Sequence, residues 1–95
     1  MPVSAESKAA TLTVYSRQGC HLCEELIESL LPLVRGRLDI EVIDVDTSAA
    51  LREIYGERVP VLEHAGCFIC QYTLDEAALR ALLARIFDEQ AREIV

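Results

Sequence analysis

LTVYSRQGCHLC (residues 12–23) is the stretch of this sequence that says most about the fold. The β-branched and aromatic residues of its first half are typical of a strand, which we expect over residues 11–16. The polar segment 17–19, which ends in a glycine, then breaks the strand pattern. Apolar residues recur at three- and four-residue spacing over residues 23–34, which predicts one buried face of a helix. A strand therefore passes directly into a helix, with two cysteines at the junction.

The rest of the chain continues the alternation of strands and helices. Pro32 falls inside the first helix, so we expect a kink or an early end near Leu31. The later elements are recognised by apolar alternation, capping residues and glycine stops. They are a strand over residues 38–45, a helix to Tyr55 capped by Asp46, Thr47 or Ser48, strands over 61–64 and 67–71, and a helix to Phe87 that opens with a capping box at 73–76.

The order β-α-β-α-β-β-α predicts an α/β fold with a mixed four-stranded sheet and helices on both faces. A chain of 95 residues has room for a single core. We assign that one domain to residues 11–95 and expect residues 1–10 to be a flexible lead-in. The composition, 52% hydrophobic and 26% charged, is that of a globular protein and excludes collagen-like or disordered chains.

The charge and the N-terminus restrict the partners and the compartment. A formal net charge of −7 disfavours binding to nucleic acids and to anionic membrane surfaces. No apolar run approaches the roughly 20 residues that span a bilayer, and residues 1–8 contain no apolar stretch of a secretion signal. We therefore expect a cytoplasmic protein, in which cysteines are more often catalytic or metal-binding than structural disulfides.

Cys20 and Cys23 occupy a position that favours thiol chemistry. At the start of a helix the first backbone N–H groups have no partner within the helix, and together with the helix dipole they stabilise a thiolate at Cys20. One turn later, Cys23 comes back beneath Cys20, close enough to attack a mixed disulfide. The alternative is that both are small apolar core residues. The strand-to-helix position favours a redox pair, with Cys20 as the nucleophile and Cys23 as the resolving thiol.

With these residues in view, the chain resembles the thioredoxin fold and, within it, the glutaredoxin-like proteins. The resemblance runs from Leu12 to Phe87 and rests on residues 12–23, on residues 55–60 before a proline, and on residues 74–76 at the start of the last helix. It implies a small thiol–disulfide oxidoreductase with a role in redox homeostasis. Its partners would be disulfide-containing proteins or small thiols and a dithiol reductant.

The resemblance also implies roles for residues around the dithiol. Val59-Pro60 would be a cis peptide facing the cysteines, with the backbone of Val59 paired to an extended substrate. Without the resemblance, Pro60 would be read as a trans proline that opens a strand. Arg17 falls where many glutaredoxins have a lysine, which would keep a cation beside the thiolate. Independently of the resemblance, His21 lies between the cysteines and would favour the thiolate when charged. Arg17 and His21 could equally be solvated residues without a role.

Two departures from the glutaredoxin pattern bear on glutathione. Glutaredoxins usually have Pro-Tyr between the cysteines, where this chain has His21-Leu22. They often have Gly-Gly before the last helix, where bare backbone holds glutathione, and Tyr72-Thr73 stand there instead. We therefore expect dithiol exchange with no bound cofactor and only weak use of glutathione.

Cys67 and Cys70 form a second Cys-X-X-Cys, which together with the first could suggest a zinc site. On a strand these two residues would point to opposite faces, so we expect no metal and interpret both as packing residues. A different class of function remains open: a non-catalytic binding module of the same fold, with a vestigial or metal-binding cysteine pair. Thiol titration with metal analysis separates the two.

Overall fold

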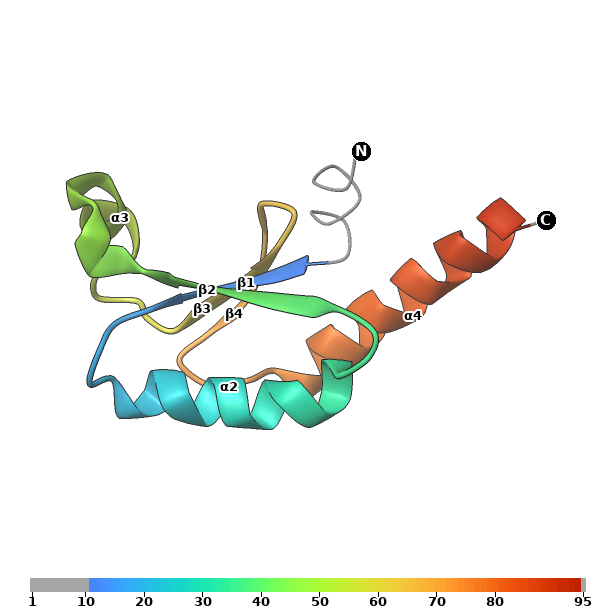
Figure 1. Ribbon diagram of the computed structural model, residues 1–95, viewed down its shortest axis with the longest axis horizontal. Coiled ribbons are helices and arrows are strands. Elements are labelled where there is room, and N and C mark those ends of the chain that lie inside the picture. The colour runs from blue at the N-terminus through green and yellow to red at the C-terminus, as the bar shows by residue number, and fades with distance from the viewer. Residues whose placement is uncertain (1–10, 95) are drawn as a thin grey trace.

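The computed structural model describes residues 11–94, with side chains through residue 88 (Figure 1). The predicted lead-in over residues 1–10 lies outside the described residues. The predicted element order is confirmed, with one added turn of 3-10 helix, η1. The elements are β1 (Thr11–Ser16), α2 (His21–Val34), β2 (Asp39–Asp44), η1 (Val45–Thr47), α3 (Ala49–Tyr55), β3 (Val61–His64), β4 (Cys67–Gln71) and α4 (Glu76–Ile94).

The four strands form a mixed sheet in the order β2-β1-β3-β4. β1 runs parallel to β2, with Ser16 beside Asp44, and antiparallel to β3, with Tyr15 beside Val61. β3 pairs antiparallel with β4, so that Val61 lies beside Gln71. The segment after β1, the segment after β2, the segment before β3 and the segment after β4 therefore meet at one end of the sheet.

Helices cover both faces of the sheet, as predicted (Figure 1). α2 and α4 lie on one face, where alternate residues of β1 are buried with the apolar faces of both helices. α3 lies on the other face, where the ring of Tyr55 stacks on Tyr15 with centroids 3.9 Å apart. The main core consists of Leu12, Val14, Leu26, Leu30, Val34, Leu38, Leu62, Cys70, Leu79, Leu82, Leu83 and Ile86.

Some local predictions were wrong. Of the kink or early end expected near Leu31, the early end is wrong, because α2 runs through Pro32 to Val34. Pro32 lies on the exposed side of the helix, so the buried face formed by Leu26, Leu30 and Val34 stays continuous. The start of α4 is capped by the carboxylate of Asp75, which accepts from the N–H of Ala78 at 3.0 Å, rather than by Thr73. For α3, the cap is Ser48, one of the three predicted residues.

Candidate functional site

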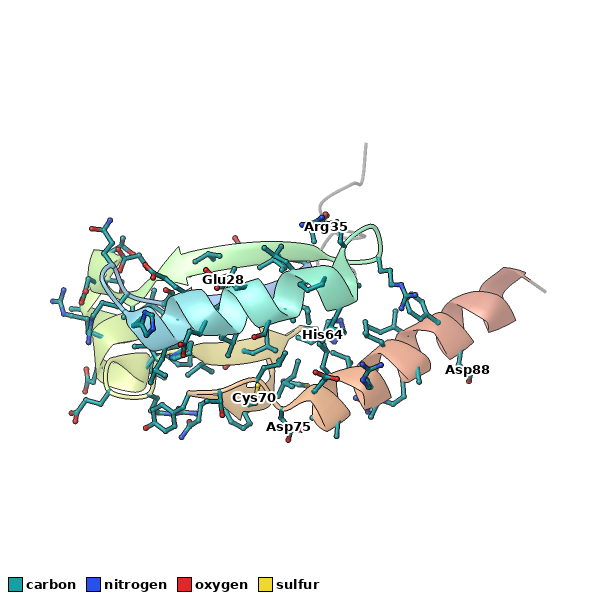
Figure 2. All side chains as sticks on the ribbon, turned by 90° about the horizontal axis from the view of Figure 1, so that it is seen from below. Glu28, Arg35, His64, Cys70, Asp75 and Asp88 are labelled. Atoms are coloured by element: carbon teal, nitrogen blue, oxygen red, sulfur yellow. A yellow bond between two sulfur atoms is a disulfide. The ribbon has the colours of Figure 1, made fainter. Side chains whose placement is uncertain are left out.

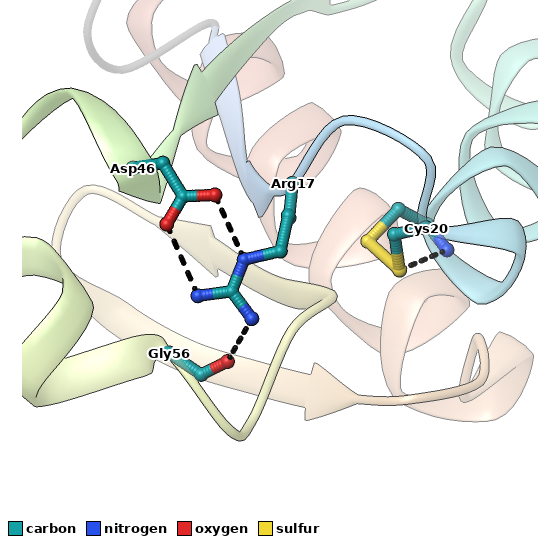
Figure 3. Close-up of a disulfide and its surroundings, with 5 residues drawn as sticks. Arg17, Cys20, Asp46 and Gly56 are labelled. Carbon is teal, nitrogen blue, oxygen red and sulfur yellow. Dashed lines mark hydrogen bonds and ion pairs between the residues drawn. A yellow bond between two sulfur atoms is a disulfide. The ribbon is translucent and has the colours of Figure 1, made fainter.

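Cys20 and Cys23 are joined by a disulfide at the N-terminus of α2 (Figure 3). Their Cα atoms are 5.2 Å apart. Cys20 is the N-cap residue and has extended backbone, and its sulfur accepts a hydrogen bond from the backbone N–H of Cys23 at 3.2 Å. The two residues differ in exposure, because Cys20 is half-buried and Cys23 is 1% exposed among the core side chains. The predicted helix-end position of the pair is thus present, with an N–H group directed at the outer sulfur.

The segment before β3 lies at the same end of the sheet. The peptide bond between Val59 and Pro60 is cis, Pro60 is buried and Val59 is half-buried. The carbonyl of Pro60 accepts from the backbone N–H of Tyr72 at 2.8 Å, and the hydroxyl of Tyr72 donates to the carbonyl of Glu57 at 3.2 Å. Tyr72 therefore holds the segment before β3 against the end of β4.

Tyr72 has a positive φ of 69°, a backbone conformation that residues other than glycine adopt at an energetic cost. Glycine would fit this backbone without strain. The tyrosine side chain is 42% exposed and forms one wall of a shallow hollow of about 300 Å³. Other walls of the hollow come from Glu25, Glu28 and Ser29 of α2 and from Thr73 and Leu74.

The guanidinium of Arg17 is directed toward Asp46 and Gly56 rather than toward the disulfide (Figure 3). Its Nε and Nη2 donate to the two carboxylate oxygens of Asp46 at 2.9 and 3.2 Å, and its Nη1 donates to the carbonyl of Gly56 at 2.9 Å. The hydrogen bond to Asp46 raises the pKa of Arg17, so the group stays charged. Arg17 thus joins the loop before Cys20 to η1 and to the end of α3.

His21, the other basic residue predicted for the site, is exposed on the first turn of α2. Its Nε2 lies 3.1 Å from a carboxylate oxygen of Glu25, an ion pair when the imidazole is protonated. The structure therefore brings Arg17, His21, Val59 and Pro60 to the end of the sheet where the disulfide lies. It also pairs Arg17 and His21 with carboxylates that the sequence interpretation did not consider.

The second cysteine pair is split between two environments. Cys70 is buried between the sheet and the start of α4, near Asp75, whereas Cys67 is exposed (Figure 2). Burial raises the pKa of the Cys70 thiol above its ordinary value of 9.0. The interpretation of both as packing residues holds for Cys70 and is wrong for Cys67. Within the described residues, no group of three or more histidine, cysteine or acidic side chains is arranged to hold a metal ion.

Asp46 and Tyr72 are the site residues that the sequence interpretation missed in these contacts. Asp46 was considered only as a helix cap, and Tyr72 only as an obstruction to glutathione. The signal for Asp46 was the parallel pairing of β1 and β2. Because Ser16 lies beside Asp44, the residues that follow the two strands lie side by side. The contact of Tyr72 with Pro60 depends on the register of β3 and β4, which includes an irregularity between Leu62 and Glu63.

A mixed sheet of this order, with a Cys-X-X-Cys disulfide at the start of its first helix, defines a thioredoxin-like fold of the glutaredoxin type. Residues 11–84 match the family described as "Glutaredoxin-like domain (DUF836)", and the chain belongs to that family. No curated protein is similar enough to match.

Solved structures agree with this assignment. Protein Ne2328 from Nitrosomonas europaea is 42% identical, with a TM-score of 0.67 over 75% of this chain and 87% of that chain. Protein XcR50 from X. campestris is 37% identical, with a TM-score of 0.62 over 78% of this chain and 96% of that chain. Oxidized glutaredoxin 2 from Chlamydomonas reinhardtii is 23% identical, with a TM-score of 0.53 over 92% of this chain and 89% of that chain, and shows the fold alone.

The glutaredoxin-like fold and the disulfide-bonded pair are consistent with a redox function. In residues 11–94, no helix has the length and apolar character needed to cross a membrane.

Proposed function

We propose that the protein is a small thiol–disulfide oxidoreductase that reduces disulfides of proteins or small thiols through Cys20 and Cys23. In the first step the thiolate of Cys20 attacks one sulfur of the substrate disulfide. A mixed disulfide forms and the other substrate sulfur leaves as a thiolate. In the second step the sulfur of Cys23, after losing its proton, attacks Cys20 and releases the second substrate thiolate. The two thiol protons end on the products, the substrate gains two electrons, and a dithiol reductant restores the protein.

The observation that carries this proposal is the unequal surroundings of the two sulfurs. Cys20 is partly accessible, and its sulfur receives an N–H hydrogen bond that favours the negatively charged form. Cys23 is 1% exposed, which disfavours its ionised form until a mixed disulfide brings an electrophilic sulfur next to it. The nucleophile is therefore the sulfur that a substrate can reach, and the resolving sulfur is protected from bulk reaction.

The segment before β3 supplies a place for the substrate backbone in this proposal. Pro60 and Val59 lie at the same end of the sheet as the disulfide, and Tyr72 holds their position through Pro60. We propose that an extended substrate pairs with the backbone of Val59 while its disulfide faces Cys20. This geometry needs no cofactor.

A stoichiometric reaction tests the proposal. Protein reduced by dithiothreitol and then freed of it is mixed with hydroxyethyl disulfide, and thiol titration follows the reaction. We expect both site thiols to be consumed with release of mercaptoethanol, and peptide mass mapping to find the Cys20–Cys23 disulfide. Cys67→Ser, which alters an exposed thiol at the other end of β4, is the matched control and should react at the wild-type rate. Consumption no faster than in Cys20→Ser would overturn the proposal and favour a binding module.

A further inference from the structure

The basic side chains on both sides of Cys20 lie against carboxylates. Arg17 precedes Cys20 by three residues and donates two hydrogen bonds to Asp46. His21 follows Cys20 directly and lies against Glu25. The positive charge that the loop would present to a substrate is therefore largely neutralised by its own neighbours.

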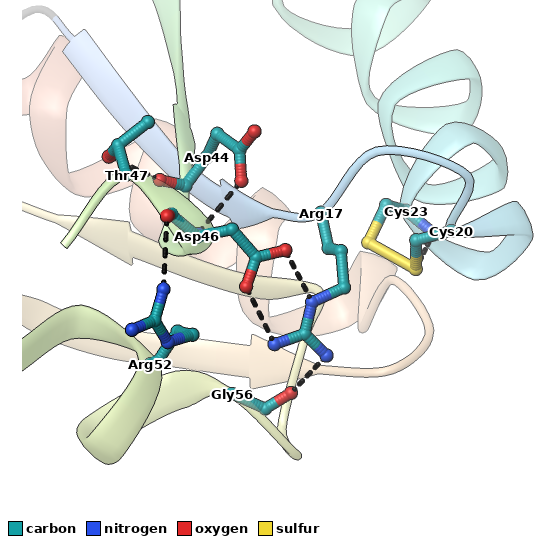
Figure 4. Close-up of polar contacts among 8 residues, drawn as sticks. All are labelled: Arg17, Cys20, Cys23, Asp44, Asp46, Thr47, Arg52 and Gly56. Carbon is teal, nitrogen blue, oxygen red and sulfur yellow. Dashed lines mark hydrogen bonds and ion pairs between the residues drawn. A yellow bond between two sulfur atoms is a disulfide. The ribbon is translucent and has the colours of Figure 1, made fainter. Parts of the chain in front are cut away.

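The pairing of Arg17 with Asp46 is a specific arrangement rather than a chance surface contact. The guanidinium uses Nε, Nη1 and Nη2 at once, two toward the carboxylate and one toward the carbonyl of Gly56 (Figure 4). Asp46 is itself held in place, because its N–H donates to Asp44 at 2.9 Å and its carbonyl accepts from Arg52 at 3.2 Å. A fork with two parallel bonds fixes the direction of both charges.

The pair is close to the reacting sulfur along the chain. The N–H of Cys20 donates to the carbonyl of Arg17 at 3.2 Å, which closes a four-residue turn. In such a turn the first and last Cα atoms lie within about 7 Å of one another. The charge pair and Cys20 therefore lie at the same end of the sheet, where a change of charge at Arg17 or Asp46 alters the field that an approaching substrate meets.

Arg58, another cation near this end of the sheet, keeps its charge but lies over Tyr55 on the face that α3 covers. Arg58 donates to Gln71 at 3.0 Å and lies over the rings of Tyr55 and Phe68. The hollow beside the first turns of α2 is lined by Glu25 and Glu28. With Arg17 paired to Asp46, the charged side chains that border this hollow are the carboxylates of Glu25 and Glu28.

We propose that Asp46 determines the charge selectivity of the dithiol: by pairing with Arg17 it disfavours anionic disulfides and leaves neutral and cationic disulfides as the preferred substrates. This inference rests on the proposed function, because it concerns the same exchange step at Cys20. It assigns Asp46 a role in specificity through Arg17, without contact with the substrate. The attacking thiolate and the bonds formed and broken are unchanged.

Three disulfides of similar size and different charge test the inference: dithiodipropionate, which is anionic, hydroxyethyl disulfide, which is neutral, and cystamine, which is cationic. The rate of single-turnover reduction is measured for each, and the anionic-to-neutral ratio is compared between variants. In Asp46→Asn, which keeps the shape and removes the charge, we expect this ratio to rise about fivefold and the cationic-to-neutral ratio to fall. This is the order expected for one unit charge uncovered near a partly exposed sulfur.

A second variant separates charge from loss of structure. Arg17→Gln breaks the same pair but leaves Asp46 unpaired, so the anionic-to-neutral ratio should fall below that of the wild type. General loosening of the loop would instead move both variants in the same direction. Asp39→Asn is the matched control, because it removes an equal charge at the opposite end of β2, and its ratio should equal that of the wild type.

Each outcome has a definite meaning. If hydroxyethyl disulfide is reduced by the wild type but Asp46→Asn leaves the ratios unchanged, or moves them in the same direction as Arg17→Gln, the inference is wrong and the proposed function stands. If no disulfide is reduced faster than by Cys20→Ser, the proposed function itself fails.

Discussion

The backbone N–H of Cys23 donates a hydrogen bond to the sulfur of Cys20 across 3.2 Å. The resolving residue of the proposed mechanism thus helps to stabilise the charge of the nucleophile through its backbone, while its own sulfur is buried. This division exists because Cys20 is the N-cap of α2 and Cys23 lies one turn into the helix on its buried face.

This asymmetry predicts different fates for the two single serine variants. Cys23→Ser retains the N–H donor and the nucleophile, so it should attack a disulfide and then stop as a stable mixed disulfide through Cys20. Cys20→Ser should not react at the site. Intact mass after exposure to excess hydroxyethyl disulfide, with peptide mapping, reads both outcomes. An adduct that accumulates at Cys23 in Cys20→Ser, with none at Cys20 in Cys23→Ser, would reverse the roles.

Tyr72 and Thr73 predict weak use of glutathione. Their side chains stand where a bare backbone would meet the ligand, and Tyr72 and Glu28 form walls of the adjacent hollow. The double variant Tyr72→Gly/Thr73→Gly should increase glutathione-coupled reduction of hydroxyethyl disulfide, since glycine also suits the φ of 69° at position 72. Thr73→Ser is the control and should behave as the wild type. Strong glutathione-coupled activity in the unaltered protein would contradict the prediction.

Leu30 and Leu31 are neighbours on α2 with opposite environments, and they make a matched test of the core. Leu30 is fully buried between the helix and the sheet, whereas Leu31 is 38% exposed. Leu30→Ala should lower the free energy of unfolding by about 2–5 kcal/mol, because it removes buried methyl groups and leaves a cavity. Leu31→Ala should change it by less than about 1 kcal/mol. Urea denaturation of both variants checks the difference. An equal decrease in the free energy of unfolding of the two variants would contradict the burial of Leu30 in the core.

The buried thiol of Cys70 predicts a pH dependence of stability. Burial raises its pKa in the folded protein above the ordinary 9.0. Above that ordinary value the unfolded chain loses the thiol proton more readily than the folded chain, so this contribution to stability is present at neutral pH and is lost as the pH rises through the folded pKa. The free energy of unfolding, measured by urea between about pH 7 and about pH 10, should fall with pH more steeply in the wild type than in Cys70→Ala.

Cys67→Ala provides the control for that comparison. Cys67 is exposed, and its replacement should leave the pH dependence as it is in the wild type. A Cys70→Ala protein with the same slope as the wild type would show that Cys70 does not contribute.

Sequence patterns predicted the elements well where one local rule acts alone. Ser48, one of the three predicted capping residues, caps α3, and the residue alternation of β1 places Leu12 and Val14 in the core. The local rules failed where packing against the rest of the fold determines the structure. Pro32 was expected to kink α2 or to end it early, and the early end is wrong, because the buried residues Leu30 and Val34 on either side of it hold the helix to Val34.

The candidate site was predictable to the extent that it depends on neighbours in the chain. The position of Cys20 and Cys23 at a helix start follows from residues 11–34 alone. The partner of Arg17 does not, because Asp46 lies 29 residues away and reaches it only through the register of β1 and β2. The same holds for Tyr72, whose contact with Pro60 requires the pairing of β3 with β4.

The turn between β3 and β4, at Ala65 and Gly66, lies at the end of the sheet opposite the dithiol. Cys67 follows this turn directly and is exposed, whereas Cys20 and Cys23 protect one another as a disulfide. A maleimide-bearing dye or solid support should therefore attach to the oxidised protein through Cys67 and leave the dithiol facing the solution. The fold thus provides a native handle for oriented immobilisation, with no added tag or engineered cysteine.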